Sequence, residues 1–160
     1  MQLTLRKTAD AGMTITTDAS WHPARNVGGY AFRISSTVYT AQDSGAITDD
    51  ARNPLDAELV CIIKALSHIL NASILQPVHW LVINTDSEQA IKKITSSDTP
   101  KAILIRKLLA DAKHCLQVNK YELRHVRAHT AVQDNRSKAN RWCDQEARRR
   151  MRQASQHKRQ

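Results

Sequence analysis

The sequence predicts a single mixed α/β domain in which helices pack on a five-stranded sheet. The length of 160 residues suits one ordinary domain, and 41% of the residues are hydrophobic, enough to bury a sizeable core. Strand-like and helix-like patterns follow one another in the order βββαβααβα. With no internal repeat or linker, we expect an N-terminal extension over residues 1–12, the domain over residues 13–151 and a basic C-terminal tail over residues 152–160.

The first three elements are expected to form an antiparallel meander. Residues 13–20 alternate between apolar and polar side chains, as a strand with one buried face does. Gly28 and Gly29 precede a second strand over residues 30–35. A third strand over residues 37–41 follows closely enough to form a hairpin.

The remaining elements alternate between helix and strand. Asn53 suits an N-cap and Pro54 the first helical position, and apolar residues then recur at helical spacing to about residue 71. Residues 78–85 are almost wholly apolar, which is typical of a strand inside a sheet. The chain is completed by a short helix over 87–94, a longer one over 99–116, a strand over 121–126 and a last helix over 140–151.

Most of the net positive charge lies near the C-terminus. Residues 136–160 hold nine Lys and Arg and two Asp and Glu, so this segment carries +7 of the chain's net +9. A polyanionic partner is the natural interpretation, because Lys and Arg near phosphates release condensed counterions, and a solvated, solubilising tail is the alternative. The segment has little apolar surface, which disfavours a membrane partner.

Other features of the sequence are less informative. No apolar run approaches the ~18 residues of a membrane span, and residues 1–12 lack the apolar core of a signal peptide, so we expect a soluble, cytoplasmic protein. Cys61, Cys115 and Cys143 include no close pair. They are expected to be buried structural thiols rather than disulfide partners or zinc ligands.

Four carboxylates occupy unusual places. Asp18 and Asp86 end apolar strands, Glu58 lies one turn inside a mostly apolar helix, and Asp144 lies near the start of the last helix. Such acids are costly unless they cap a turn, pair with a cation or hold a metal, and for each acid alone a turn or a pair is the simpler explanation. If the sheet brings them together, Mg²⁺ or Mn²⁺ would suit them, and two such ions could support phosphodiester cleavage.

Several segments resemble the motifs of type 1 ribonuclease H. They are Thr17-Asp18-Ala19-Ser20, Ala57-Glu58-Leu59, Thr85-Asp86-Ser87 and residues 140–148, NRWCDQEAR. Gly28-Gly29-Tyr30 also follows Asp18 at the offset of the family's Gly-Gly-Tyr turn. The order of elements matches as well, so the resemblance covers about residues 13–151.

The resemblance implies an endoribonuclease that cuts the RNA strand of RNA–DNA hybrids with two Mg²⁺ ions, or with Mn²⁺, and leaves a 3′-hydroxyl and a 5′-phosphate. Asp18, Glu58, Asp86 and Asp144 would be the metal ligands, with Asp18 bridging both ions. His129 stands in the place of the family's mobile histidine, which assists proton transfer or product release. His125 is the competitor, although the alternation of its strand predicts that it faces the sheet or solvent.

The chain also departs from the family pattern. Pro54 and Leu55 replace two Asn residues that sense 2′-hydroxyls, Ala24 replaces an Asn of the first loop, and Glu88 replaces a Gln. The segment Ile94–Val118 is too short for the basic, Trp-rich protrusion of many members, and the basic C-terminal segment is expected to replace it. The expected substrate-binding residues are Ser20, Asn26, Asn53, Arg148, Arg149 and Arg150.

Two alternative functions remain beside hybrid cleavage. One is a nuclease of the same fold acting on double-stranded RNA or on DNA, which the altered 2′-hydroxyl contacts make plausible. The other is a non-catalytic nucleic-acid-binding module that uses the basic tail. A monomer is expected in each case, with no obligate protein partner.

Overall fold

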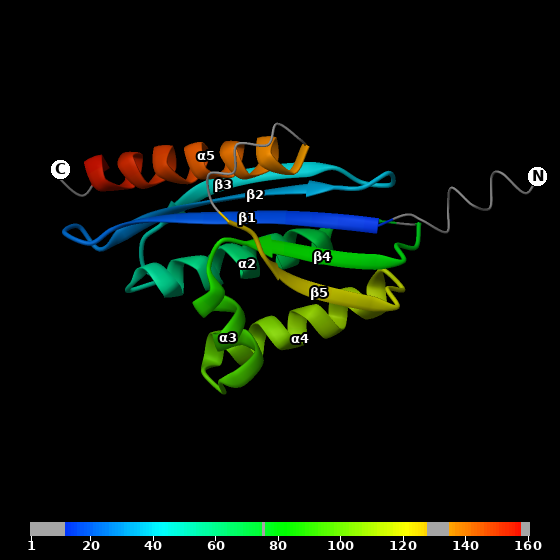
Figure 1. Ribbon diagram of the computed structural model, residues 1–160. Helices are drawn as coiled ribbons and strands as arrows, with labels where there is room; N and C mark the ends of the chain where they lie inside the picture. Colours follow the sequence, from blue (N-terminus) through cyan, green and yellow to red (C-terminus); the bar gives the residue numbers. More distant parts are fainter. Residues whose placement is uncertain (1–11, 75, 128–134, 158–160) are drawn as a thin grey trace, which may run out of the picture.

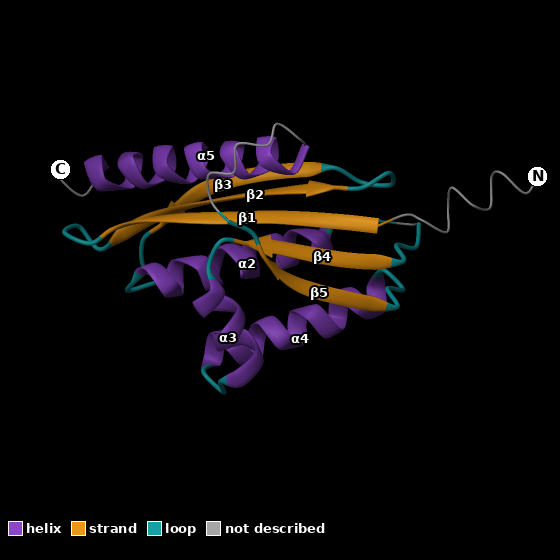
Figure 2. Cartoon of the chain, in the orientation of Figure 1, coloured by secondary structure: helices purple, strands orange, loops and turns teal. Residues whose placement is uncertain are grey.

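Five strands form one mixed sheet in the computed structural model, which describes residues 12–74, 76–127 and 135–157 (Figures 1 and 2). They are β1 (Gly12–His22), β2 (Val27–Ser35), β3 (Ala41–Ile47), β4 (Trp80–Thr85) and β5 (Lys120–His125), in the spatial order β3-β2-β1-β4-β5. The first three pair antiparallel, whereas β4 is parallel to β1 and β5 is parallel to β4. The predicted fold class is therefore confirmed.

The described helices lie on both faces of the sheet. On one face are α2 (Pro54–Asn71), α3 (Glu88–Ser96) and α4 (Pro100–Cys115), and α5 (Asn135–His157) lies along the other (Figure 1). The main core fills the space between the sheet and α2 and α4, and its largest fully buried side chains include Met13, Ile15, Phe32, Leu59, Ile62, Leu66, Ile83 and Ile105. Burial of such a side chain stabilises the fold by about 1.5–3 kcal/mol, so this face supplies most of the hydrophobic stabilisation.

The opposite face holds α5 very close to the strands. A Cβ atom at Gly29 of β2 would overlap the carbonyl oxygen of Ala147 and would lie 2.5 Å from the backbone nitrogen of Met151. Small residues make this approach possible, because Ala31, Cys143 and Ala147 form a second buried cluster beneath the helix. The second glycine of the Gly28-Gly29 pair is thus required where a helix backbone meets a strand backbone.

The starts of α2, α3 and α4 agree well with the sequence prediction. The side chain of Asn53 accepts a hydrogen bond from the backbone nitrogen of Asp56 at 2.8 Å, and Pro54 is the first residue of α2. Ser87 caps α3 in the same way, through Ala90 at 3.1 Å. Residues 97–99 alone connect α3 to α4, so the chain has no room for a protrusion there.

Three details of the prediction were wrong. The third strand spans Ala41–Ile47 and not residues 37–41, because the Ser36 hydroxyl bonds to backbone atoms of Val38 and Tyr39 and closes a turn there. The last helix begins at Asn135 and continues to His157, so residues 152–157 of the expected tail are helical. Cys61 and Cys143 are buried as expected, whereas Cys115 is exposed.

The helices that the structure describes include none long and apolar enough to cross a membrane.

Candidate metal centre

The topology brings three of the predicted acids to one point beside β1. The parallel pairing of β1 with β4 ends at Thr16 and Asn84, two residues before Asp18 on one strand and Asp86 on the other. Since β4 ends at Thr85, Asp86 is the first residue beyond it. Glu58 approaches from the second turn of α2, which packs on β1 and β2.

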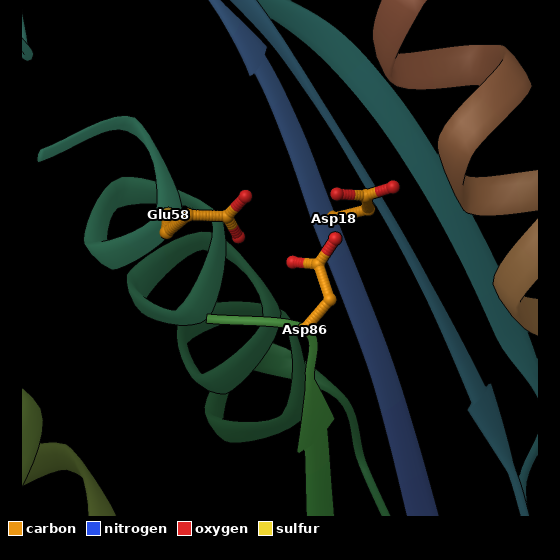
Figure 3. Close-up of side chains that lie close together, drawn as sticks. All are labelled: Asp18, Glu58 and Asp86. Atoms are coloured by element: carbon orange, nitrogen blue, oxygen red, sulfur yellow. The ribbon is translucent and has the colours of Figure 1, made fainter. Parts of the chain in front are cut away.

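The three side chains point toward one another from β1, α2 and the end of β4 (Figure 3). One carboxylate oxygen from each of Asp18, Glu58 and Asp86 lies within 4.8 Å of the other two. Two oxygens bound to one Mg²⁺ at about 2.1 Å are at most about 4.2 Å apart, so small side-chain movements would bring these atoms to a shared ion. We call these three residues the acid cluster.

Two residues of the acid cluster share one backbone hydrogen-bond donor. The backbone nitrogen of Ala19 donates to Asp18 Oδ1 at 2.9 Å and lies 3.3 Å from Glu58 Oε1. Glu58 is 9% exposed, and its buried Oε2 has no hydrogen-bond partner among the described residues. Because a buried carboxylate oxygen without a partner is costly, a cation is the ligand that this oxygen fits best.

The electrostatics agree with that interpretation. Burial, and then repulsion from Asp86 and Asp144, raises the pKa of Asp18 to about 8. Burial, and then Asp18 and Asp86, raises the pKa of Glu58 well above its ordinary value. Like charges that are brought together without a counter-ion behave in this way, and a divalent cation would favour the ionised forms instead.

Asp144 reaches the same place from the other face of the sheet. Asp144 lies close enough to Asp18 for its negative charge to contribute to the raised pKa of Asp18. Asp144 Oδ1 also forms an ion pair with Arg148 Nε at 3.3 Å. Cys143, next to Asp144, holds α5 against β1 because its thiol donates to the Thr16 carbonyl oxygen at 3.5 Å. Three of the four predicted acids therefore form the close group, and Asp144 on α5 lies near enough to Asp18 to influence its pKa.

The structure describes one of the two candidate histidines. His129 lies outside the described residues. His125, at the end of β5, has Nε2 3.1 Å from the backbone oxygen of Asp86 and Nδ1 3.5 Å from Glu88 Oε1. It is exposed, as expected, but it borders the acid cluster and faces the additional negative charge of Glu88.

The expected substrate-binding residues lie in different settings. Ser20 is part-buried on β1, two residues beyond Asp18, and Asn26 is exposed in the β1–β2 turn with φ 55°. Asn53 is exposed, but its side-chain oxygen caps α2. The three arginines on α5 also differ: Arg148 pairs with Asp144, Arg149 pairs with Glu146 at 2.9 Å, and Arg150 Nε donates to Ser44 Oγ at 3.0 Å.

The sequence prediction missed two features near the acid cluster, one contact and one residue. The first is the contact of His125 with Asp86, which depends on the register of β5 against β4. The second is Asn84 of β4, which is fully buried and has no partner for either side-chain amide atom among the described residues. A polar residue in an otherwise apolar strand was the available signal for Asn84.

Comparison with known proteins adds evidence of a different kind. The model of the family described as RNase H matches residues 10–152. The chain is also similar in structure to the N-terminal RNase H domain of Rv2228c from Mycobacterium tuberculosis, which was solved as a fusion with maltose-binding protein. The TM-score is 0.63 at 17% sequence identity, over 92% of this chain and 98% of that chain. No curated protein matches the sequence.

Proposed function

The chain belongs to the RNase H family, and from this premise we propose that it is a metal-dependent endoribonuclease that hydrolyses the RNA strand of RNA–DNA hybrids. The observation that carries the proposal is the acid cluster, in which three carboxylates from separate elements lie within 4.8 Å of one another. Glu58 Oε2 has no hydrogen-bond partner among the described residues, which supports a cation at this point. Hard carboxylate oxygens favour Mg²⁺ or Mn²⁺ over softer metals.

The four acids have the ligand role in this proposal. Asp18, Glu58, Asp86 and Asp144 would hold two divalent ions. Bound ions of this kind lower the pKa of an attacking water and stabilise the oxygen that leaves. To act as ligands the acids must be ionised, so their raised pKa values describe the ion-free protein. Arg148 would orient Asp144 through their ion pair.

Hydrolysis then follows the chemistry of a phosphodiester. Water adds to phosphorus, the bond from phosphorus to the 3′ oxygen breaks, and that oxygen takes up a proton. The products are a 3′-hydroxyl and a 5′-phosphate. We assign proton transfer or product release to His129, with His125 as the competitor that borders Asp86.

Recognition of the RNA strand is assigned to Ser20, Asn26 and Asn53. The start of α2 favours a second candidate function, cleavage of double-stranded RNA or of DNA. Pro54 and Leu55 have no side-chain hydrogen-bonding group for a 2′-hydroxyl, and the Asn53 side-chain oxygen is used in the cap. A non-catalytic binding module is the third candidate, and the presence of all four acids argues against it.

One experiment separates the three candidates. End-labelled hybrid, double-stranded RNA and duplex DNA are each incubated with the full chain in Mg²⁺, Mn²⁺ or EDTA, with Asp86→Asn as the control. We expect cleavage of the RNA strand of the hybrid with either ion, and none in EDTA or with the variant. Preferential cleavage of either other duplex would support the second candidate, and binding without cleavage of any of them would support the third.

A further inference from the structure

The outward face of α5 carries a row of cations. Lys138, Arg141, Arg148 and Arg152 are all exposed, and their spacings of three, seven and four residues place them along one side of the helix. Gln145, also exposed, occupies the gap at position 145. We call these four cations the basic stripe.

The neighbouring arginines are engaged elsewhere. Arg149 makes two hydrogen bonds to Glu146, each of 2.9 Å, and Arg150 is part-buried with its Nε on Ser44 Oγ of β3. In contrast, Arg141 and Arg152 form no ion pair with any residue that the structure describes. Arg148 is itself paired with Asp144, so among the described cations of the helix the charge most available to a ligand lies on Lys138, Arg141 and Arg152.

The basic stripe passes directly beside the proposed catalytic centre. Arg148 Nε lies 3.3 Å from Asp144 Oδ1, and the thiol of the adjacent Cys143 donates to the carbonyl oxygen of Thr16 on β1, two residues before Asp18. Arg141 and Arg152 lie on the two sides of Asp144 along the helix. Lys138 and Arg152 are fourteen residues apart, which corresponds to about 21 Å of helix.

We propose that the basic stripe binds backbone phosphates of a nucleic-acid duplex. A phosphodiester of the same duplex, close to the bound phosphates, would then lie at the acid cluster. One strand of a duplex advances about 3.4 Å per phosphate, so a length of 21 Å spans about six phosphates. An anionic membrane fits the surface poorly, because glutamine and not an apolar side chain fills the gap between the cations. The assignment of this duplex as an RNA–DNA hybrid rests on the proposed function, whereas binding to the basic stripe does not.

The test measures binding without cleavage. Affinity for a fluorescent hybrid is measured in EDTA over a range of salt concentrations for the wild type and for R141Q/R152Q. Neither residue is a proposed metal ligand. The matched control is K107Q/K113Q, which removes the same charge from exposed positions on α4, on the opposite face of the sheet.

A plot of log affinity against log salt concentration has a negative slope. We expect R141Q/R152Q to make this slope shallower by about 2, since each phosphate contact contributes about 0.9. Two such contacts correspond to about a 30-fold loss of affinity at about 0.15 M salt. The control should keep the wild-type slope. An unchanged slope in R141Q/R152Q, or an equal change of slope in the control, would overturn the proposal. Binding to anionic phospholipid vesicles is measured for the same variants. If R141Q/R152Q loses vesicle binding while its affinity for hybrid stays constant, the proposal is also overturned.

The same variants distinguish this inference from the proposed function. If the wild type cleaves no duplex but R141Q/R152Q still loses salt-dependent binding, the basic stripe is supported and catalysis is not. If the wild type cleaves hybrid and R141Q/R152Q has unchanged affinity and salt slope, catalysis is supported and the basic stripe is not.

Discussion

Replacing Asp18 by Asn should stabilise the metal-free protein. Burial, and then repulsion from Asp86 and Asp144, raises the pKa of Asp18 from 3.8 to about 8. The folded state therefore binds a proton that the unfolded state has lost between about pH 4 and pH 8, and stability falls as the pH rises through this window. Asn has the shape of the neutral acid and carries no charge, so the variant avoids this cost.

The size of the effect follows from the two pKa values. At about pH 7 the difference from the unfolded value is roughly three pKa units, and each unit corresponds to 1.36 kcal/mol, which gives an upper figure of about 4 kcal/mol. Water still reaches this part-buried group, so we expect a gain in the free energy of unfolding on the order of 2–4 kcal/mol. Below about pH 4 both states bind the proton, and the gain should disappear.

Urea denaturation followed by circular dichroism in EDTA measures this gain at each pH. Asp111→Asn on α4 is the matched control, because Asp111 is exposed and remote from the acid cluster. The reasoning would be refuted if Asp18→Asn were no more stable than the wild type at about pH 7, or if its advantage were equally large at about pH 4.

Three further predictions concern the rest of the site and its support. Mg²⁺ or Mn²⁺ at a hundred times its dissociation constant should raise the free energy of unfolding of the wild type by about 2.7 kcal/mol. The same concentration should raise that of Asp86→Asn much less. Equal stabilisation of the two proteins in thermal denaturation would argue against the site. Gly29→Ala should cost about 1–3 kcal/mol in urea denaturation, because its Cβ would overlap the Ala147 carbonyl oxygen, and wild-type stability would show that α5 does not pack as described. His129→Ala should lower kcat on hybrid by about 100-fold. His125→Ala should lower it by less than about 10-fold, since the polar contacts of His125 with described residues are a backbone oxygen and an exposed carboxylate. The reverse order in steady-state kinetics would make His125 the proton-transfer residue.

Local chemistry made the helix starts predictable. Asn53 and Pro54 carry their own signal, since an N-cap oxygen and a fixed φ act within a few residues. The third strand carried no such signal, because Ala41–Ile47 contains Gln42, Asp43 and Ser44 and lacks apolar alternation. Its position depends on pairing with β2, a tertiary contact.

The site divides in the same way. Asp18, Glu58 and Asp86 were conspicuous at the end of an apolar strand or inside an apolar helix, whereas Asp144 lies in a polar helix. Family motifs were needed to select these four from the 15 Asp and Glu residues. The contact of His125 with Asp86 depends on pairing Thr85 with His125, and the packing of α5 depends on Gly29 and Ala147 meeting across 118 positions of the sequence. Periodicity alone does not specify such long-range registers.

Cleavage of RNA–DNA hybrid by Asp18→Asn tests the central claim most directly. The account predicts a variant that is more stable than the wild type without metal, still binds hybrid in EDTA, and produces no RNA fragments with Mg²⁺ or Mn²⁺. Cleavage by this variant at the wild-type rate would contradict the claim that the crowded acids are the catalytic metal ligands.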